Sequence, residues 1–318
     1  MADNCYIGID TSNYTTSVAL VQEDGTVLAN LKSPLPVRAG ECGLRQSDAV
    51  FAHVRNLPAL MCALEEHLQG RTPLAVGVSG KPRDAKDSYM PCFLAGKAAA
   101  QALAAGLHVP LFPFSHQNGH LMAAVYGAGA QEALLGRAFG AFHVSGGTTE
   151  LLSVKPKDLD FFVEKMGGTA DLNAGQAVDR IGVMLGLDFP CGPALEHLAE
   201  QNAARVPRPR IAVSGVSCNL SGLENLARKL FEQSGDAPLV AAFTLDFIAE
   251  TLAAMAENFR AEHGALPLLF AGGVMSNRRI ANALRARFDS IYFAPPAYSA
   301  DNAVGVALLC RARHRAKQ

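Results

Sequence analysis

Residues 6–31 read YIGIDTSNYTTSVALVQEDGTVLANL, and this stretch decides the fold class. Apolar runs at residues 6–10 and 17–22 flank a polar turn at residues 11–16, and a second turn leads into a third apolar run at residues 26–31. Short apolar runs separated by turn residues are typical of β-strands joined by hairpins. The stretch therefore predicts a β-meander of three strands.

The same pattern returns in the second half of the chain. An apolar run at residues 138–144, a Gly-rich turn at 145–148 and a returning run at 149–154 repeat the opening hairpin. Helical and strand-like stretches alternate elsewhere, which is typical of sheets covered by helices. We therefore predict an α/β fold with two similar lobes around a cleft. The expected boundaries are residues 1–130 for the N-terminal lobe, 131–298 for the C-terminal lobe, and 299–318 for a C-terminal helix that returns to the N-terminal lobe.

Apolar periodicity and the positions of Gly, Pro and capping residues place the remaining elements. The expected helices cover residues 47–69, 93–105, 175–185, 193–201, 238–262, 276–288 and 301–315, with a further helix after Ser115. The expected strands cover residues 74–78, 109–112, 266–270 and 291–293.

The composition excludes one class of function. The chain has 318 residues, of which 49% are hydrophobic, so it can bury a sizeable core. Its formal net charge is -1, which excludes a nucleic-acid binder that works by bulk charge alone. Trp is absent and only 7% of the residues are aromatic. A ligand site must therefore rely on backbone, small residues and polar groups more than on stacking.

The sequence indicates a cytoplasmic protein with no membrane segment. No basic run precedes an apolar segment at the N-terminus, and Gly, Asn or charged residues interrupt the apolar stretches before they reach membrane-spanning length. The seven cysteines are scattered, and none forms a C-x-x-C pair. We therefore expect buried reduced thiols and neither a zinc ribbon nor a redox motif.

Three turns carry residue types that suit phosphate. The first is Asp10-Thr11-Ser12-Asn13, where a tight turn would expose backbone N–H groups and hydroxyls. The second is the Ser-Gly-Gly turn within Val144–Thr149, and the third is the Gly-Gly turn of Phe270–Val274, which leads to Asn277 and a helix. Each could equally be a plain structural turn. The phosphate-turn candidates of the first motif are Asp10, Thr11 and Ser12.

Two histidines stand four residues apart at His116 and His120. On a helix these positions share one face, so both imidazoles could reach one metal ion. A zincin motif requires Glu after the first His, and Gln117 stands there, so metalloprotease chemistry is not expected. The alternative is a pair of ordinary core or surface histidines.

Two acidic residues have both a functional and a structural interpretation. Asp179 follows Gly175 by one helical turn. An acidic residue near a nucleotide commonly accepts hydrogen bonds from ribose hydroxyls. The alternative is that Asp179 is an exposed helical carboxylate. Asp301 precedes the last helix and is either its N-cap or the carboxylate that completes a metal site with the histidines.

Taken together and in this order, the motifs resemble those of the TsaD family, the tRNA N6-adenosine threonylcarbamoyltransferases. Each segment is short, but the set in this order is specific and spans nearly the whole chain. The resemblance implies the actin-like ASKHA fold, which is also that of Hsp70-like ATPases. The similar segments are Asp10–Ser17, His116–His120, Val144–Thr149, Gly175–Asp179, Pro190–Pro193, Ser221–Glu224, Ala271–Asn277 and Asp301–Ala303.

The resemblance also implies ligands. One divalent metal ion, Fe²⁺ or Zn²⁺, would be held by His116, His120 and Asp301. An adenine nucleotide, as threonylcarbamoyl-AMP, ATP or AMP, would lie between the lobes. The positions that match the family's ligand contacts are His143, Val144, Ser145, Gly146, Gly147, Asp179, Gly192 and Asn277.

By resemblance, the reaction transfers the threonylcarbamoyl group from threonylcarbamoyl-AMP to N6 of the adenosine next to the anticodon in ANN-decoding tRNAs. The metal would polarise or orient the acyl group, and the target base lies in an accessible loop. Expected partners are tRNA, through local contacts, a paralogous ASKHA dimer partner and an accessory ATPase. Basic residues that could contact tRNA, or be solvated loop charges, are Lys81, Arg83, Lys86, Arg205, Arg208 and Arg210.

The sequence departs from the family pattern at several places. Charged or catalytic-type residues of the family are replaced here by Tyr14, Thr15, Thr148, Gln176 and Glu224, and the family's Gly-Pro-Gly-rich segment reads Gly80–Asp84. The departures favour a divergent paralogue. A second hypothesis is therefore a nucleotide-binding regulatory or partner subunit without turnover, and a third is an ASKHA sugar or acid kinase, in which the histidine pair has no obvious role.

Overall fold

The computed structural model describes residues 3–12, 14–36 and 44–318. Asn13 of the first turn motif and Cys42 lie outside these residues. The chain divides into two compact units. Residues 156–162, which the sequence-based boundaries placed in the C-terminal lobe, group with unit 1. Unit 1 comprises Met1–Gly129, Pro156–Phe162 and Ala297–Gln318, and unit 2 comprises Ala130–Lys155 and Val163–Pro296.

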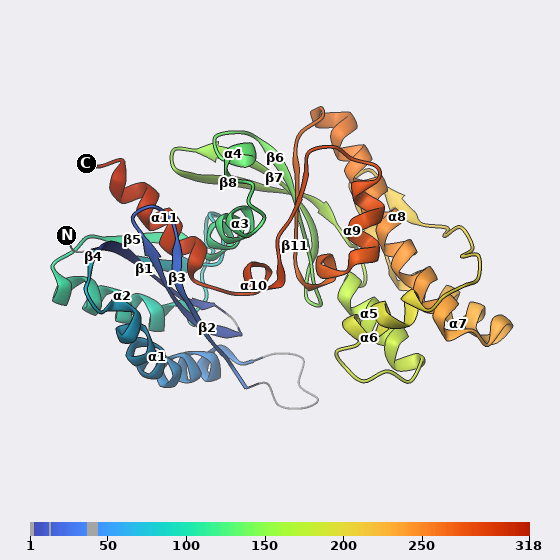
Figure 1. Cartoon of the computed structure of the whole chain (residues 1–318), viewed down its shortest axis with the longest axis horizontal. Coiled ribbons are helices and arrows are strands. Elements are labelled where there is room, and N and C mark those ends of the chain that lie inside the picture. The colour runs from blue at the N-terminus through green and yellow to red at the C-terminus, as the bar shows by residue number, and fades with distance from the viewer. Residues whose placement is uncertain (1–2, 13, 37–43) are drawn as a thin grey trace. The chain divides into compact units, whose positions relative to one another are not determined.

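Unit 1 contains a five-stranded sheet in the order β3-β2-β1-β4-β5 (Figure 1). β1 pairs antiparallel with β2 and parallel with β4, and β4 pairs parallel with β5. The strands are β1 (Asp3–Ser12), β2 (Thr15–Gln22), β3 (Val27–Pro34), β4 (Arg71–Lys81) and β5 (Leu111–Ser115). The helices are α1 (Gln46–Leu68), α2 (Phe93–Leu107), α3 (His116–Gly127), α11 (Val304–Arg315) and, at the start of the last segment, α10 (Pro296–Ser299).

Unit 2 repeats this topology. Its five-stranded sheet has the order β12-β11-β6-β7-β8, and β6 pairs antiparallel with β7 and parallel with β11, as β1 does with β2 and β4. The strands are β6 (Phe139–Val144), β7 (Thr149–Lys157), β8 (Asp160–Gly168), β11 (Leu268–Ala271) and β12 (Ile291–Phe293), with a separate ribbon of β9 (Ala212–Ser214) and β10 (Ser217–Asn219). The helices are α4 (Gln131–Leu134), α5 (Ala174–Met184), α6 (Gly192–Glu200), α7 (Ser221–Ser234), α8 (Ala237–His263), α9 (Arg278–Arg285) and the 3₁₀ turn η1 (Gly273–Ser276). Two units with one sheet order confirm the predicted α/β class.

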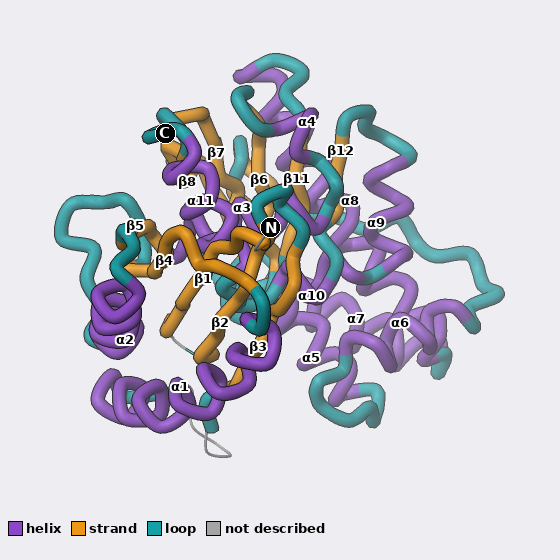
Figure 2. Tube along the Cα trace, turned by 60° about the vertical axis from the view of Figure 1, so that its left-hand side comes forward, coloured by secondary structure: helices purple, strands orange, loops and turns teal. Residues whose placement is uncertain are grey.

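Strand alternation in β1 separates the two helical layers of unit 1. Ile7 and Ile9 pack into a cluster with apolar residues of α1 and α2, whereas Gly8 between them faces α11. Gly8 is level with Gly77 of β4, and a Cβ on Gly8 would lie 2.5 Å from the Ala303 carbonyl oxygen. The two glycines therefore allow α11 to lie directly on the strand backbones, on the side of the sheet away from α1 and α2 (Figure 2).

The core of unit 2 is arranged around α8. Phe142, Phe270 and Phe293 stack in sequence across β6, β11 and β12, with ring centroids 4.7 and 5.1 Å apart. Among the described residues, α8 is the only helix long and apolar enough to cross a membrane, and 83% of its most apolar window is buried within the structure. It is therefore the central core helix of this unit.

The first two strands extend further into the polar stretch at residues 11–16 than predicted, so the predicted turn was too long, and Tyr14 lies in the turn that remains. Thr11 pairs with Thr16 and Ser12 with Thr15 in the β1–β2 ladder. All four side chains carry hydroxyls. Whether such residues lie in a strand depends on how their side chains pack against neighbouring elements. β8 and α7 were also not predicted.

Candidate functional site

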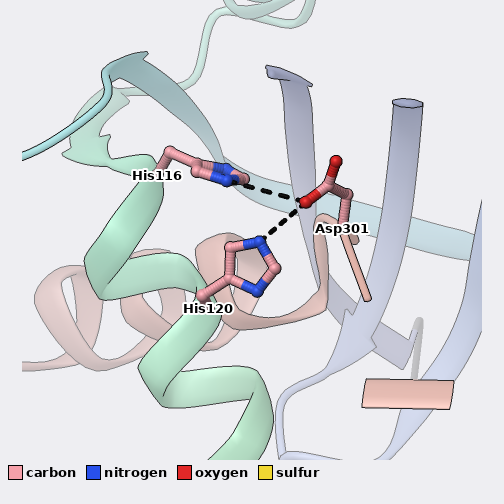
Figure 3. Close-up of side chains that lie close together, drawn as sticks. All are labelled: His116, His120 and Asp301. Carbon is pink, nitrogen blue, oxygen red and sulfur yellow. Dashed lines mark hydrogen bonds and ion pairs between the residues drawn. The ribbon is translucent and has the colours of Figure 1, made fainter. Parts of the chain in front are cut away.

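The two histidines lie on the first turns of α3 in unit 1. Ser115 is the N-cap of this helix, and its hydroxyl accepts a hydrogen bond from the Asn118 backbone N–H. The His116 and His120 rings are one helical turn apart, with centroids separated by 4.3 Å and planes inclined by 87°. Both side chains point toward Asp301 (Figure 3). The helix therefore presents two imidazoles to one point in space.

Asp301 comes from the loop that enters α11. Its Oδ1 lies 2.9 Å from His120 Nε2 and 3.7 Å from His116 Nε2. The expectation that Asp301 caps the helix is wrong, because α11 begins at Val304 and the buried Asn302 accepts the Val304 backbone N–H instead. The carboxylate is therefore directed at the histidines.

A close helix crossing fixes the distance between these groups. Gly119 lies between the two histidines on α3, and Gly305 lies four residues after Asp301 on α11. A Cβ on Gly305 would collide with the Gly119 carbonyl oxygen. The absence of side chains at the crossing lets α3 and α11 pack backbone to backbone, which brings Asp301 within reach of both imidazoles.

Asp10 at the end of β1 orients the first histidine. The His116 Nδ1–H donates to Asp10 Oδ2 at 2.6 Å, and the other oxygen of Asp10 accepts the Ser12 backbone N–H at 2.8 Å. Burial opposes a charge on His116, but Asp10 and Asp301 outweigh it and raise the pKa of His116 to about 9. With Nδ1 engaged, the nitrogen that remains for a ligand is Nε2, on the side of Asp301.

The three side chains fit a divalent metal ion. One ligand atom from each of His116, His120 and Asp301 lies within 4.8 Å of the others. Two imidazole nitrogens and one carboxylate oxygen are a donor set that Fe²⁺ and Zn²⁺ both accept. The Asp10–His116 pair is the arrangement that commonly fixes the tautomer of a metal-ligating histidine. Sequence reasoning missed this role of Asp10, which it assigned to phosphate.

The first turn motif is not an exposed anion site. Asp10, Thr11 and Ser12 are all buried. The Thr11 hydroxyl donates to the Cys92 carbonyl oxygen and accepts the Gly96 backbone N–H, so it holds the first turn of α2. The Asp10 carboxylate and the Thr11 hydroxyl are engaged within unit 1, whereas the buried Ser12 hydroxyl has no hydrogen-bond partner among the described residues. The assignment of this motif to phosphate therefore stays a prediction.

The second turn motif, in unit 2, has an open face. Ser145 closes the turn through its backbone N–H to the Thr148 carbonyl oxygen, and the Thr148 N–H donates to the Ser145 hydroxyl. Gly175 of α5 packs beneath it, where a Cβ would lie 2.6 Å from the Gly146 nitrogen. A Cβ on Gly146 or Gly147 would meet nothing within 4 Å. The turn therefore leaves exposed backbone at the carboxyl end of β6.

The third motif lies beside this turn. Gly272 adopts φ of +105°, and a Cβ there would collide with the Val144 carbonyl oxygen, so the two Gly-rich turns meet. Asn277 is the N-cap of α9, and its side chain accepts the Ile280 backbone N–H. His143 is half-buried and pairs in register with Ala271. These residues share the edge of the sheet at which β6 and β11 end.

Asp179 is half-buried and partly engaged. Its Oδ1 accepts the Cys191 backbone N–H at 2.9 Å, which joins α5 to the start of α6. Gly192 follows, with open space where a Cβ would be. Asp179 is therefore not an exposed helical carboxylate, which was the alternative interpretation of this residue.

The sequence of the chain matches a known family over most of its length. The model of TsaD, tRNA N6-adenosine threonylcarbamoyltransferase, matches residues 89–308, which is more than half of the chain. The chain belongs to the TsaD family.

Solved structures similar to this TsaD-family chain show its fold. HypF of T. kodakarensis matches with a TM-score of 0.62 at 14% identity, over 99% of this chain and 48% of that one. A ROK family glucokinase from Streptomyces griseus, solved with glucose and AMPPNP, matches with a TM-score of 0.53 at 14% identity, over 96% and 99% of the two chains. The activator of the 2-hydroxyisocaproyl-CoA dehydratase from Clostridium difficile, with bound ADPNP, has a TM-score of 0.51 at 14% identity, over 99% and 97%. These matches confirm the two-lobed ASKHA fold.

Two departures of this TsaD-family chain have structural partners. Gln176 accepts the Asn173 backbone N–H and so completes a capping box at the start of α5. Glu224 pairs with Arg180 at 3.4 Å and with Arg228 at 3.2 Å. Both side chains thus stabilise local structure in unit 2, α5 and α7 in particular.

Proposed function

We propose that this protein transfers the threonylcarbamoyl group of threonylcarbamoyl-AMP to N6 of the adenosine next to the anticodon in ANN-decoding tRNAs. The observation that carries the proposal is the meeting of His116, His120 and Asp301, backed by Asp10, in a chain of the TsaD family. A kinase that acts on a small substrate has no need of this donor set.

In the proposed reaction, the N6 lone pair attacks the carbamoyl carbonyl carbon. A C–N bond forms, the bond from that carbon to the phosphate oxygen breaks, AMP leaves, and the N6 proton passes to solvent or to a released phosphate oxygen. A bound Fe²⁺ or Zn²⁺ would supply Lewis acidity that polarises or orients the acyl group. Asp10 holds the proton of His116 on Nδ1 and so keeps Nε2 directed at the metal position.

The nucleotide is proposed to bind unit 2. The exposed backbone of the Ser145–Gly147 turn suits phosphate, because no Cβ hinders its approach. Asp179 and Asn277 provide polar groups near the same sheet edge. Two solved structures of this fold hold the nucleotide analogues ADPNP and AMPPNP, which supports the assignment. The remaining proposed contacts are those of His143, Val144 and Gly192.

Recognition of tRNA is proposed to be local and shared with partner proteins. The net charge of -1 provides no general attraction for RNA. Exposed arginines in the loop before β9 and basic residues after β4 are the candidate contacts, and a paralogous ASKHA subunit and an ATPase would assist in the cytoplasm. These residues are Arg205, Arg208, Arg210, Lys81, Arg83 and Lys86.

The direct test is a modification assay. The purified protein, threonylcarbamoyl-AMP, an ANN-decoding tRNA and the candidate partner proteins are combined, and modified adenosine is measured by mass spectrometry of the digested tRNA. We expect product that depends on His120 and on added Fe²⁺ or Zn²⁺, and His120→Ala should abolish it. His197→Ala is the matched control, since His197 is an exposed histidine of α6. Absence of product in every combination would refute the proposal.

A second candidate is a nucleotide-binding partner subunit without turnover. The observation that favours it is the use of Glu224, at a position where the family has Lys, in ion pairs with Arg180 and Arg228. This candidate requires binding of ATP or AMP with no tRNA product. Rescue of a strain that lacks its housekeeping transferase would exclude it.

A further inference from the structure

A pocket of about 440 Å³ lies in unit 1, apart from the histidine site. Two of its carboxylates, Asp84 and Asp160, accept hydrogen bonds from Asn118 Nδ2. Asn118 is two residues from each histidine, which places it on the opposite face of α3. The pocket and the candidate metal site are therefore separated by the helix.

The walls of the pocket come from parts of the chain that are far apart in sequence. The end of β4 provides Lys81, the loop after it provides Asp84, and α2 provides Lys97. The segment 157–160 provides Lys157, Asp158 and Asp160. β5 and α11 complete the wall with an aromatic ring and a guanidinium group. A volume of this size is typical of small-molecule sites, which are roughly 300–1,000 Å³.

Two of the carboxylates in the pocket are already engaged. Asp84 Oδ1 forms an ion pair with Lys81 at 2.8 Å, and its Oδ2 accepts from Asn118. Asp160 Oδ1 accepts from Asn118 and from the Phe161 backbone N–H, and burial raises the pKa of this carboxyl group. Both groups are thus partly neutralised by protein donors.

The cations are less engaged. Within the described part of the chain, Lys97 and Lys157 form no ion pair, and both are exposed at the rim. Asp158 is the remaining carboxylate that faces them. Lys81 and Arg313 pair with Asp84 and Asp160, and Lys97 and Lys157 then stand against Asp158 alone, so the pocket has one excess positive charge.

Arg313 is held in place by an aromatic ring and a carboxylate. Its guanidinium lies over the Phe114 ring, 5.1 Å from the centroid, and 3.6 Å from Asp160 Oδ2. It makes no hydrogen bond to any residue that the structure describes. An arginine fixed by an aromatic face and a nearby carboxylate keeps its fork of N–H groups available for a planar or tetrahedral anion.

We propose that this pocket binds a phosphate ester, with Arg313 as the two-point anchor and Lys97 and Lys157 as flanking charges. The Phe114 ring and Pro113 form an apolar wall for the carbon part of the ester. The inference does not depend on the proposed transfer reaction, because no residue of the pocket belongs to the histidine site or to the proposed nucleotide site, and Lys81, which is also a candidate tRNA contact, is not one of the proposed phosphate ligands. The same phosphate chemistry occurs in a free sugar phosphate and in an RNA backbone, and the experiment separates the two.

The test is the rate at which an acylating reagent modifies individual lysines of the full chain, read by peptide mass spectrometry. Probes are ribose 5-phosphate and a short single-stranded RNA, and Lys229, an exposed lysine of α7, is the reference. We expect either probe to slow modification of Lys97 and Lys157 and to leave Lys229 unchanged. Protection by ribose 5-phosphate identifies a free ester as sufficient, and protection by RNA alone assigns the phosphate to a nucleic acid backbone.

Variants show whether the protection comes from the pocket. In Arg313→Gln, the probe concentration that gives half-maximal protection should rise about 10- to 100-fold, as expected for loss of charge-assisted hydrogen bonds. Arg315→Gln, on the same helix and outside the pocket, should leave it unchanged. Lys97→Gln, at an exposed position, should weaken protection of Lys157. Unchanged lysine reactivity with both probes, or protection that survives Arg313→Gln, would overturn the proposal, whatever the transferase assay shows.

Discussion

A side chain on Gly305 of α11 would collide with the backbone carbonyl oxygen of Gly119 on α3. The helix that carries His116 and His120 and the helix that follows Asp301 therefore touch through their main chains, and any added atom must separate them. The geometry of the His116, His120 and Asp301 group depends on this contact, although neither glycine bears a functional group.

The first prediction concerns this crossing. Gly305→Ala should lower the free energy of unfolding by about 3 kcal/mol, at the upper end for an overpacked core, because the contact is with backbone that cannot rotate away. It should also weaken Zn²⁺ binding, measured by competition with a chelating dye. Gly106→Ala is the control, since a Cβ at that exposed helical site meets nothing within 4 Å. It should leave metal binding unchanged and raise stability by about 0.5–1 kcal/mol. Equal effects of the two substitutions would contradict the prediction.

The second prediction concerns Asp10. Asp10→Asn keeps the size of the side chain but removes the charge that holds the His116 proton on Nδ1. We expect Zn²⁺ affinity to fall by about 10- to 100-fold, the usual effect of losing a carboxylate behind a ligating histidine. Asp3→Asn, at the exposed start of the same strand, should have no effect. An unchanged affinity in Asp10→Asn would show that Asp10 does not orient the ligand.

The third prediction is a pH dependence of stability from Asp171 in unit 2. Burial opposes its charge, but donors from Ser221, Leu220, Leu172 and Asn219 outweigh this and hold the pKa of the carboxyl group well below its usual range. Because the folded-state pKa is lower than the unfolded one, the stabilisation is complete above pH of about 4 and is lost as the pH falls toward the folded-state value.

Denaturant unfolding at several pH values tests this dependence. Asp171→Asn should lower stability at neutral pH by about 1 kcal/mol, as for loss of a cap at a helix N-terminus, here that of α7. The difference from the wild type should shrink as the pH falls below about 4. A difference that stays constant with pH would assign the effect to packing and not to the charge.

The fourth prediction concerns the open turn of unit 2. Gly147→Val should fold normally, because the site of its Cβ is empty, and it should reduce AMP binding about tenfold or more by blocking the approach of phosphate to the main chain. Gly222→Val in α7, also in open space, should bind AMP as the wild type does. Calorimetric titration with AMP measures both. Normal AMP affinity in Gly147→Val would place the phosphate elsewhere.

The fold class was predictable from sequence because the hairpin at residues 6–22 recurs at residues 138–154, and the structure gives both hairpins the same place in a sheet. The turn between the first two strands was predicted too long, at residues 11–16. Thr11 and Thr16 look like turn residues by type, but α2 and α1 cover them, and sequence alone does not show that cover. Tertiary packing decided the outcome there.

The site was predictable only in part. The spacing of His116 and His120 on one helical face indicated a shared ligand. The two interpretations of Asp301 could be separated only by seeing that Asn302, and not Asp301, accepts the Val304 backbone N–H. The roles of Asp10 and Gly305 depend on contacts across more than a hundred residues of chain. No local sequence pattern encodes such contacts. The first family motif contains Asp10, but it does not show that Asp10 contacts His116.

The group in unit 1 also has an order of assembly. Asp10 and the two histidines are synthesised early, but Asp301 and α11 follow after about 180 further residues, most of them in unit 2. While the chain is being made, the emerging unit 1 has an uncovered sheet face at Gly8 and Gly77 and only two of its three candidate metal ligands. A chain that ends before Asp301 therefore cannot assemble the three candidates, and any ion held by all three must bind after Asp301 has been synthesised.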